Sequence, residues 1–254
     1  MVDWTKEELI DILQYTLLPP LNAKELESNS VKDYQTRLTR LDAQFVSEIY
    51  HENSKLNEYN VDRLITQNAL IKDVKEWYLS TACNIQDDVI DNRGGEVFRR
   101  LGAFSSCIEK ILAELKGKEA LSSLFYSIDL LILDEGRLYR FLPRKDYLIL
   151  EKTVSDEERK ELRVWMLQKP SPQQEDGMLF IVGAPWRNMI FYGQRGYRQM
   201  LFDAGFFFNA VQSIGQDQHI AMNTYTLFYD NKINKLLNLD GVETYALGVI
   251  SISS

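Results

Sequence analysis

The sequence is poor in the residues that staple small domains or bind metals. Its 254 residues include two cysteines, Cys83 and Cys107, and two histidines, His51 and His219. The cysteines show no CxxC spacing, and neither histidine is flanked by ligand-spaced carboxylates or cysteines, which disfavours a disulfide framework and a metal site. Such cysteine usage is typical of a reduced compartment, so we expect a cytoplasmic protein.

Long apolar runs and an excess of positive charge are also missing. No stretch approaches the roughly 20 apolar residues that span a membrane, and MVDWTKEELIDIL at the amino terminus is acidic and amphipathic, unlike a targeting peptide. The formal net charge of −8 opposes contact with nucleic acid over most of the surface. Gly94-Gly95 lacks a GxGxxG or P-loop context. We therefore expect neither a nucleic-acid nor a membrane partner.

The chain is long enough to bury about 70–75 % of its unfolded surface, which suits one large domain. Before it, Thr5 and Glu8 form a capping box for an amphipathic helix that must end at Pro19-Pro20. We divide the chain into an amino-terminal helical arm, 1–55, and a domain, 56–254. Residues 31–50 fit both helical and strand periodicity, and that choice stays open.

Helices and strands alternate irregularly through the domain, which indicates the α+β class. Helical spacing predicts a helix over 70–83 and another after Ser155, which forms a capping box with Glu158. Strands are expected on both sides of Pro143, over MLFIVGA, over HIAMNTYTLF and over TYALGVISIS. A short helix with Asp230 as its N-cap is expected before Gly241.

The longest predicted helix, GQRGYRQMLFDAGFFFNAVQSI, occupies 193–214 and has two faces. Spacing of 4-3-4-3 predicts a core face, made of Tyr197, Leu201, Ala204, Phe208 and Val211. A second stripe has no side chain at its centre and predicts a contact face, made of Arg195, Arg198, Phe202, Gly205, Asn209 and Gln212.

Two arginines open this helix, where the macrodipole opposes each cation by roughly 0.3–1 kcal/mol. A bound anion would resolve the conflict, because the free N–H groups and the guanidinium groups would hold it together. Alternatively, Arg195 and Arg198 are solvated or paired with a carboxylate such as Asp203. The spacing alone leaves both interpretations open.

A family pattern runs through the carboxy-terminal part of the chain. It comprises Tyr192, Arg195-Gly196-Tyr197-Arg198, Leu201, Asp203-Ala204-Gly205, Asn209, Asp230, Ile233, Leu237 and Leu239-Asp240. These residues resemble the corresponding half of the nitroreductase-superfamily flavoproteins. Within that superfamily they are most similar to the azoline dehydrogenases of streptolysin-S-like and microcin-like peptide biosynthesis. LYRFLPRKDYLILEK also resembles the family's Y-x-Y-x-P segment.

The resemblance implies an α+β dimer with exchanged arms, a mixed sheet flanked by helices, and FMN at the subunit interface. It implies a two-electron oxidation of thiazoline or oxazoline rings to azoles in a ribosomally made precursor peptide, beside a cyclodehydratase. Tyr192 would be the catalytic acid/base. The residues expected to contact the cofactor are Arg99, Arg100, Ser105, Ser106, Arg195, Arg198, Gly205 and Asn209.

Two departures from the family pattern matter. Phe191 stands where the family has a catalytic lysine, so either Tyr192 acts alone with its pKa lowered by a neighbouring cation, or the chemistry is lost. The segment 99–109 keeps Arg, Gly, Ser and Ile-Glu but lacks the family's Pro-Ser-Gly-Gly run. The family would begin a strand near Ile108, whereas periodicity predicts a helix for CIEKILAELKGK.

Other interpretations stay open. The chain can be a degenerate, non-catalytic subunit that binds peptide or completes a complex with an active paralogous subunit. It can also be an ordinary nitro- or quinone reductase that uses NAD(P)H. Tyr192 and the Phe206-Phe207-Phe208 run can simply pack, and Arg99-Arg100 can be a solvated basic pair.

Overall fold

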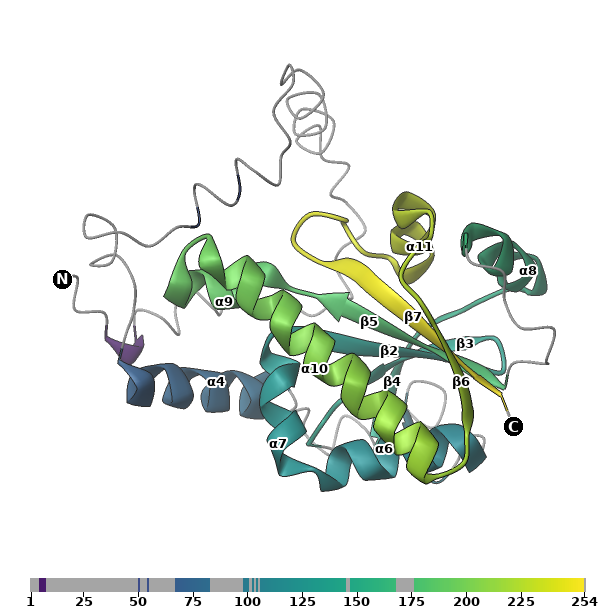
Figure 1. Ribbon diagram of the computed structural model, residues 1–254, viewed down its shortest axis with the longest axis horizontal. Coiled ribbons are helices and arrows are strands. Elements are labelled where there is room, and N and C mark those ends of the chain that lie inside the picture. The colour runs from purple at the N-terminus through teal and green to yellow at the C-terminus, as the bar shows by residue number, and fades with distance from the viewer. Residues whose placement is uncertain are drawn as a thin grey trace, which may run out of the picture.

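The computed structural model describes residues 5–7, 50, 54, 67–82, 98–100, 102, 104, 106–144, 147–167 and 176–253. Helices cover both faces of one sheet, and the long helix α10 runs across it (Figure 1). The helical elements are α4 (Asn68–Ala82), α6 (Ser106–Gly117), α7 (Glu119–Ser122), the 3-10 turn η4 (Ser123–Tyr126), α8 (Asp156–Trp165), α9 (Pro185–Tyr192), α10 (Arg195–Asp217) and α11 (Asp230–Leu237). The α+β class is confirmed.

Seven strands form the sheet in the order β1-β4-β3-β2-β5-β7-β6. They are β1 (Phe98–Arg100), β2 (Ile128–Asp134), β3 (Arg137–Phe141), β4 (Tyr147–Thr153), β5 (Gly177–Gly183), β6 (Ala221–Tyr225) and β7 (Tyr245–Ser253). Each pairing among these described strands is antiparallel, so the sheet is not the mixed one that was expected. The predicted strands around Pro143 are β3 and β4, and MLFIVGA is β5, with most of its residues buried between β2 and β7.

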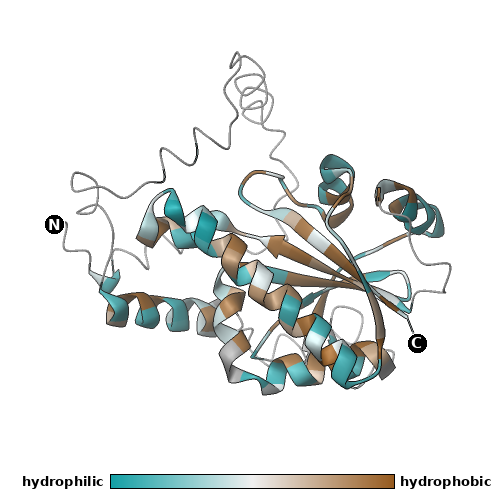
Figure 2. Ribbon diagram, viewed as in Figure 1, coloured by the Kyte–Doolittle hydropathy of each residue, from teal (hydrophilic) through white to brown (hydrophobic). Residues whose placement is uncertain are grey.

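Alternate strand residues face two separate apolar cores, and the strands are correspondingly hydrophobic in Figure 2. On one face Leu130, Ile181 and Ile250 pack beneath α4, α6 and α10. On the other, Leu131 and Phe180 pack with α8 and α11. Because both faces are covered, strands such as β2 and β5 carry continuous apolar runs rather than an alternating pattern.

The helix termini follow the sequence in one case and depart from it in another. Ser155 and Glu158 form the predicted capping box of α8, with each side chain bonded to the other residue's backbone N–H. The N-cap of α11 is Tyr229, so Asp230 is the first helical residue and the prediction that it is the cap is wrong. The acidic side chain still lies in the first turn, where the macrodipole favours it. Asn238 ends α11 in a left-handed conformation, φ 57°.

The core face of α10 is rotated from the predicted one. Ala204 and Val211 are buried as expected, but Leu201 is 42 % exposed. The buried positions of α10 are Gly196, Met200, Asp203, Ala204, Phe207, Val211, Ile214 and Gly215. The predicted contact face is confirmed as exposed at its centre, since Phe202 is 63 % exposed and nothing lies within 4 Å of a side chain placed at Gly205.

The segment that begins near Ile108 is the helix α6, as periodicity predicted, and not the strand that the resemblance implied. Most of the predicted arm, 1–55, and Ser105 lie outside the described residues. Within the described helices, none is both long and apolar enough to cross a membrane.

Candidate functional site

The corner between α9 and α10 builds the candidate site. Gly193 takes a positive φ of 53°, which lets α9 end at Tyr192 and α10 begin at Arg195 with only two residues between them. Gly196 lies so close to the backbone of Asn188 and Met189 that a β-carbon there would overlap it. The two helices therefore meet at a fixed angle, which sets the side chains of both around one cavity.

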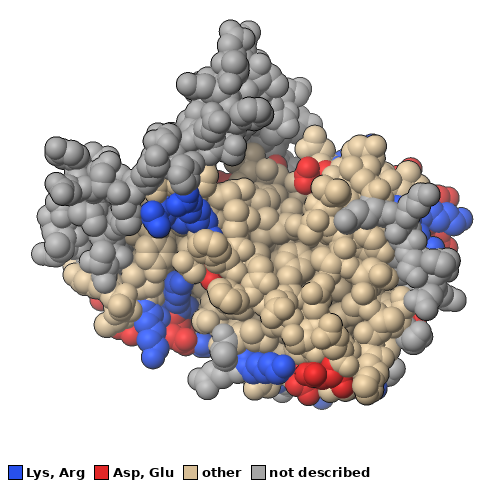
Figure 3. Space-filling model, in the orientation of Figure 1, with Lys and Arg blue, Asp and Glu red and all other residues tan. Residues whose placement is uncertain are grey.

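This cavity has a volume of about 590 Å³ and joins three residues predicted from the sequence, namely Tyr192, Arg195 and Arg198. The remaining lining residues are Tyr50, Gln199, Leu201 and Phe202. The volume lies within the roughly 300–1,000 Å³ typical of small-molecule sites. Figure 3 shows basic side chains gathered near the start of α10, beside a broad face with few charges along the rest of the helix.

The backbone at the start of α10 is less available to an anion than the sequence suggested. The N–H groups of Gly196 and Tyr197 donate to the carbonyl groups of Gly193 and Gln194, at 2.9 and 3.3 Å. An anion would therefore be held mainly by the two guanidinium groups. Arg195 and Arg198 are both half-buried and line the cavity, so neither side chain simply extends into solvent.

Both arginines also contact the described residues of the arm. Arg195 Nη1 donates to the Ser54 carbonyl oxygen at 3.4 Å. The Arg198 guanidinium lies 5.9 Å from the centroid of the Tyr50 ring, and the Tyr50 hydroxyl donates to the Gln194 carbonyl oxygen at 3.0 Å. Through these contacts Tyr50 lies beside both arginines in the cavity lining.

Tyr192 also lines the cavity, and the direction of its pKa shift could not be read from the sequence. Burial, and then the Asp203 carboxylate, raise the pKa of Tyr192, so of the two alternatives left open by the sequence, the structure does not support a pKa lowered by a cation. Its neighbour Phe191 is fully buried, with ring centroids 5.9 Å from Tyr126 and 6.0 Å from Tyr192. Phe191 therefore belongs to the core. The raised pKa of Tyr192 keeps its side chain a neutral phenol.

A buried hydrogen-bond network connects the cavity lining to the protein core. The Asp203 carboxylate accepts from the Ser127 hydroxyl and, at 2.9 Å, from Gln199 Nε2. Asn188 Nδ2 donates to the Ser127 hydroxyl at 2.6 Å. Asp203 is therefore engaged with neutral donors rather than in the alternative predicted role as partner of the two arginines. Gln199 belongs to both the network and the cavity wall.

A buried ion pair fixes α9 to the sheet. Arg187 Nη1 and Nη2 donate to the two carboxylate oxygens of Asp129 on β2, at 2.8 and 2.9 Å. Arg140 Nη1 also donates to this carboxylate, at 3.0 Å. Burial would raise the pKa of Asp129, but the charges of Arg187 and Arg140 hold it below its usual range. The pair is bidentate, which orients α9 as well as holding it.

The second predicted arginine motif lies elsewhere. Arg99 on the edge strand β1 forms an ion pair with Asp134 at 2.9 Å and lies 4.3 Å from the ring centroid of Phe104. Arg100 is exposed. Ser106 begins α6. None of these residues lines the cavity at α10 within this chain, so the structure does not unite the two predicted motifs.

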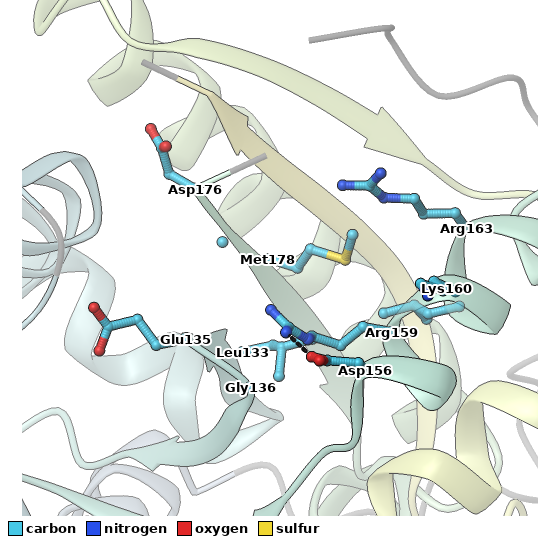
Figure 4. Close-up of a pocket in the computed structure, with 11 residues that line it drawn as sticks. Leu133, Glu135, Gly136, Asp156, Arg159, Lys160, Arg163, Asp176 and Met178 are labelled. Atoms are coloured by element: carbon cyan, nitrogen blue, oxygen red, sulfur yellow. Dashed lines mark hydrogen bonds and ion pairs between the residues drawn. The ribbon is translucent and has the colours of Figure 1, made fainter. Parts of the chain in front are cut away.

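A second, smaller cavity of about 290 Å³ opens on the other side of the sheet (Figure 4). Its lining mixes both signs of charge, with Arg159, Lys160 and Arg163 on α8 opposite Glu135 and Asp176. Arg159 already pairs with Asp156 one turn earlier. This mixed charge selects no single ligand class, so the cavity at α10 is the better candidate.

Sequence reasoning missed several residues of the site. Tyr50, Gln199 and Asn188 are separated in sequence, and only the helix spacing of Gln199 and Asp203 gave a local signal. The contact of Arg187 with Asp129 joins residues 58 apart, which no local pattern shows. In the part of the chain that the structure describes, no cluster of three or more His, Cys, Asp or Glu forms a metal site.

The residues present fit a flat ligand that carries a phosphate. Two guanidinium groups provide forked donors for a phosphate, and aromatic side chains at Tyr50 and Tyr192 offer faces for a ring system. The exposed Leu201 and Phe202 supply apolar surface at the rim. FMN is a ligand that has this combination of a phosphate and a flat ring system.

Comparisons with known proteins show a likeness in fold alone. Neither the models of known protein families nor the curated protein sequences gave a match. A putative nitroreductase from Anabaena variabilis is similar in structure, with a TM-score of 0.57 and 15% identity over 82% of this chain. This chain spans only 46% of that protein's length.

A second structure matches along its whole length. The E. coli microcin synthetase McbBCD complex, solved with truncated pro-MccB17 bound, contains a chain of TM-score 0.52 and 15% identity, covering 100% of this chain and 98% of that one. At this identity the likeness concerns the fold. The helix-flanked sheet and these two structures together identify the fold of the chain as nitroreductase-like, a fold that a chain of the microcin synthetase complex also resembles.

Proposed function

We propose that the protein is an FMN-dependent dehydrogenase or oxidase that converts azolines to azoles in a ribosomally synthesised peptide. The observation that carries the proposal is the cavity in which Tyr192, Arg195 and Arg198 converge. The fold likeness to a chain of a peptide-modifying synthetase supports this choice over a reductase of small quinones.

Arg195 and Arg198 would hold the phosphate of the cofactor, with Gln199 bonding polar edges of the ligand. When bound, FMN would take up the electron pair and one proton that the azoline ring loses, and dioxygen would restore its oxidised form. The ring's second proton must go to the protein. Tyr192, as a neutral phenol, can hydrogen-bond the ring and exchange a proton with it, but its raised pKa prevents it from acting as a standing base.

A second copy of the chain would complete the site. Phe202 and Phe206 are 63 % and 67 % exposed along α10, with the open Gly205 between them. A stripe of this kind on a monomer marks an interface. Because Leu201 and Phe202 belong to the cavity wall too, the second copy would cover the cavity from outside. We infer a dimer that works with a cyclodehydratase complex on a precursor peptide.

The visible absorption spectrum of the purified protein tests the proposal first. A flavin band, retained through gel filtration or restored by added FMN, is expected. The holoprotein should then remove two hydrogen atoms per ring from a thiazoline-containing peptide, which mass spectrometry detects. Protein that stays colourless and fails to bind added FMN contradicts the proposal.

Phe191 favours one other function. Phe191 is fully buried and has no proton to exchange, whereas the resembled family has a lysine at this position. The Arg99 motif also lies away from the cavity in this chain. A non-catalytic subunit that binds peptide beside an active paralogous subunit would tolerate both features. Turnover by the lone chain excludes this function, whereas activity only after mixing with a flavin-loaded partner supports it.

A further inference from the structure

Gln199 contributes an amide group to the lining of the cavity at α10, and its side chain is half-buried. Its Nε2 donates to Oδ1 of Asp203 at 2.9 Å, and the two residues are neighbours on one face of the helix because they lie four positions apart. The Gln199 side chain forms no other hydrogen bond with the part of the chain that the structure describes. The amide therefore has bonding capacity left for a ligand.

Asp203 determines which way this amide is turned. The Asp203 side chain is buried, and its second oxygen accepts from the Ser127 hydroxyl, which in turn accepts from Asn188 Nδ2 at 2.6 Å. A carboxylate has acceptors only, so it can bond the nitrogen of the glutamine amide but not the oxygen. Gln199 Nε2 is consequently turned towards the buried network, and Oε1 is left for the cavity.

The unused groups of the Gln199 amide form a donor–acceptor pair. Nε2 carries two hydrogen atoms, and the bond to Asp203 uses one of them. One N–H donor and the Oε1 acceptor remain, and both lie in the plane of the amide. Glutamine uses this pair to bond two adjacent groups on the edge of an adenine base. A ligand that satisfies both groups must present an acceptor and a donor side by side.

Few chemical groups meet this requirement. A phosphate or a carboxylate offers acceptors alone. An ordinary peptide bond is trans, so its N–H and C=O point to opposite sides and cannot both meet one amide edge. A cyclic amide, or lactam, is held cis by its ring and therefore places its N–H and C=O on the same side. The flavin ring system contains such a group, namely N3–H with a carbonyl group beside it.

We propose that Gln199 determines specificity for the ring of the ligand by pairing with a lactam edge. Oε1 accepts from the ring N–H, and Nε2 donates to the neighbouring carbonyl oxygen. Asp203 is a positioning residue that acts through Gln199. The inference rests on the proposed function, in which the lactam is that of FMN and the phosphate is held by Arg195 and Arg198. It assigns the amide to the cofactor, because the trans amides of the precursor peptide do not fit it.

The test compares FMN with 3-methyl-FMN, in which a methyl group replaces the N3 hydrogen atom. Both flavins carry the same phosphate, so the contribution of the two arginines cancels in the ratio of their affinities. Quenching of flavin fluorescence measures each affinity. Wild-type protein should bind FMN about 2- to 12-fold more tightly than 3-methyl-FMN, which is the range for one neutral hydrogen bond. Gln199→Met should bind the two flavins with nearly equal affinity.

Two further variants complete the comparison. Gln216→Met is the matched control, because Gln216 is exposed in the last turns of α10 and lies outside the cavity lining, and it should keep the wild-type ratio. Asp203→Asn should reduce the ratio, since an asparagine amide can donate as well as accept and so allows Gln199 to turn either way. A change in stability alone would leave the ratio unaltered. An unchanged ratio in Asp203→Asn would therefore contradict its positioning role.

A second measurement uses the wild-type protein alone. In FMN labelled with nitrogen-15 at N3, the N3–H proton should be protected from exchange with water in the complex, and its NMR signal should move to lower field on binding. Rapid exchange of this proton in the complex overturns the inference. A ratio near one in the wild type, or a wild-type ratio that persists in Gln199→Met, overturns it as well.

The outcomes also separate this inference from the proposed function. Protein that binds FMN and 3-methyl-FMN alike contradicts the role of Gln199 alone. Protein that discriminates between them through Gln199 but oxidises no thiazoline contradicts the proposed function alone. Protein that binds neither flavin contradicts both.

Discussion

Replacing Arg198 by methionine should separate ligand binding from folding. Arg198 lies in the first turn of α10, lines the cavity, and contacts the Tyr50 ring at 5.9 Å. A hydrogen bond to a charged group contributes about 1.5–3 kcal/mol. Because each 1.4 kcal/mol is about tenfold, the variant should bind FMN about 10- to 150-fold more weakly.

The effect of this substitution on folding should be small. A cation–π contact at a partly exposed site contributes about 0.5–1 kcal/mol, and removing a cation from the start of a helix returns about 0.3–1 kcal/mol of dipole repulsion. The net change is below about 1 kcal/mol, or at most about 4 °C in Tm for a domain of this size.

Affinity is measured by the quenching of FMN fluorescence, and Tm by differential scanning calorimetry of the apoprotein. Arg137→Met removes the same charge from an exposed position on β3, outside the cavity lining, and should change neither value. Equal losses of affinity and stability in Arg198→Met would mean that Arg198 is a structural residue and that the anion argument is wrong.

Three further substitutions test other parts of the structure. Asp129→Asn breaks the buried pair with Arg187 and should lower the free energy of unfolding in urea by about 3 kcal/mol at neutral pH. Because the pKa of Asp129 is lowered in the folded protein, the stabilisation by its carboxylate in the wild type is present above about pH 4. This stabilisation should be lost as the pH falls through the folded pKa. Phe206→Ser should remove about 3 kcal/mol of apolar contact per protomer from a dimer, and light scattering should show the loss of the dimer. Val164→Ser changes a similarly exposed residue on α8 and should leave the dimer intact. A wild-type protein that is monomeric at all concentrations refutes this interface. Gly196→Ala should lower the free energy of unfolding by about 1–3 kcal/mol, because the added methyl group would overlap the α9 backbone. An unchanged Tm in a thermal scan would contradict the close approach of Gly196 to α9.

Local sequence patterns predicted the helices and strands of this fold better than the way in which they pack together. The α8 capping box needs only residues three apart, and it was correct in each hydrogen bond. Periodicity also placed α6 correctly, where the family resemblance implied a strand. In contrast, the core face of α10 was misplaced at Leu201, because its apolar residues surround the helix and only the packed sheet decides which of them are buried.

The site was predictable only where its residues lie close in sequence. Tyr192, Arg195 and Arg198 fall within two turns and do meet in one cavity. Ser127 and Asp129 lie on other elements, and their contribution depends on long-range packing. The raised pKa of Tyr192 arises from burial and from Asp203, neither of which a linear sequence displays.

Leu201 and Phe202 belong at once to the wall of the cavity and to the uncovered stripe of α10. In the proposed dimer, a second copy that covers the occupied cavity would couple ligand binding to self-association, and each would then strengthen the other by the same factor. Dilution of the protein would loosen its hold on the cofactor, and saturation with cofactor would hold the two copies together at concentrations where the empty chains separate.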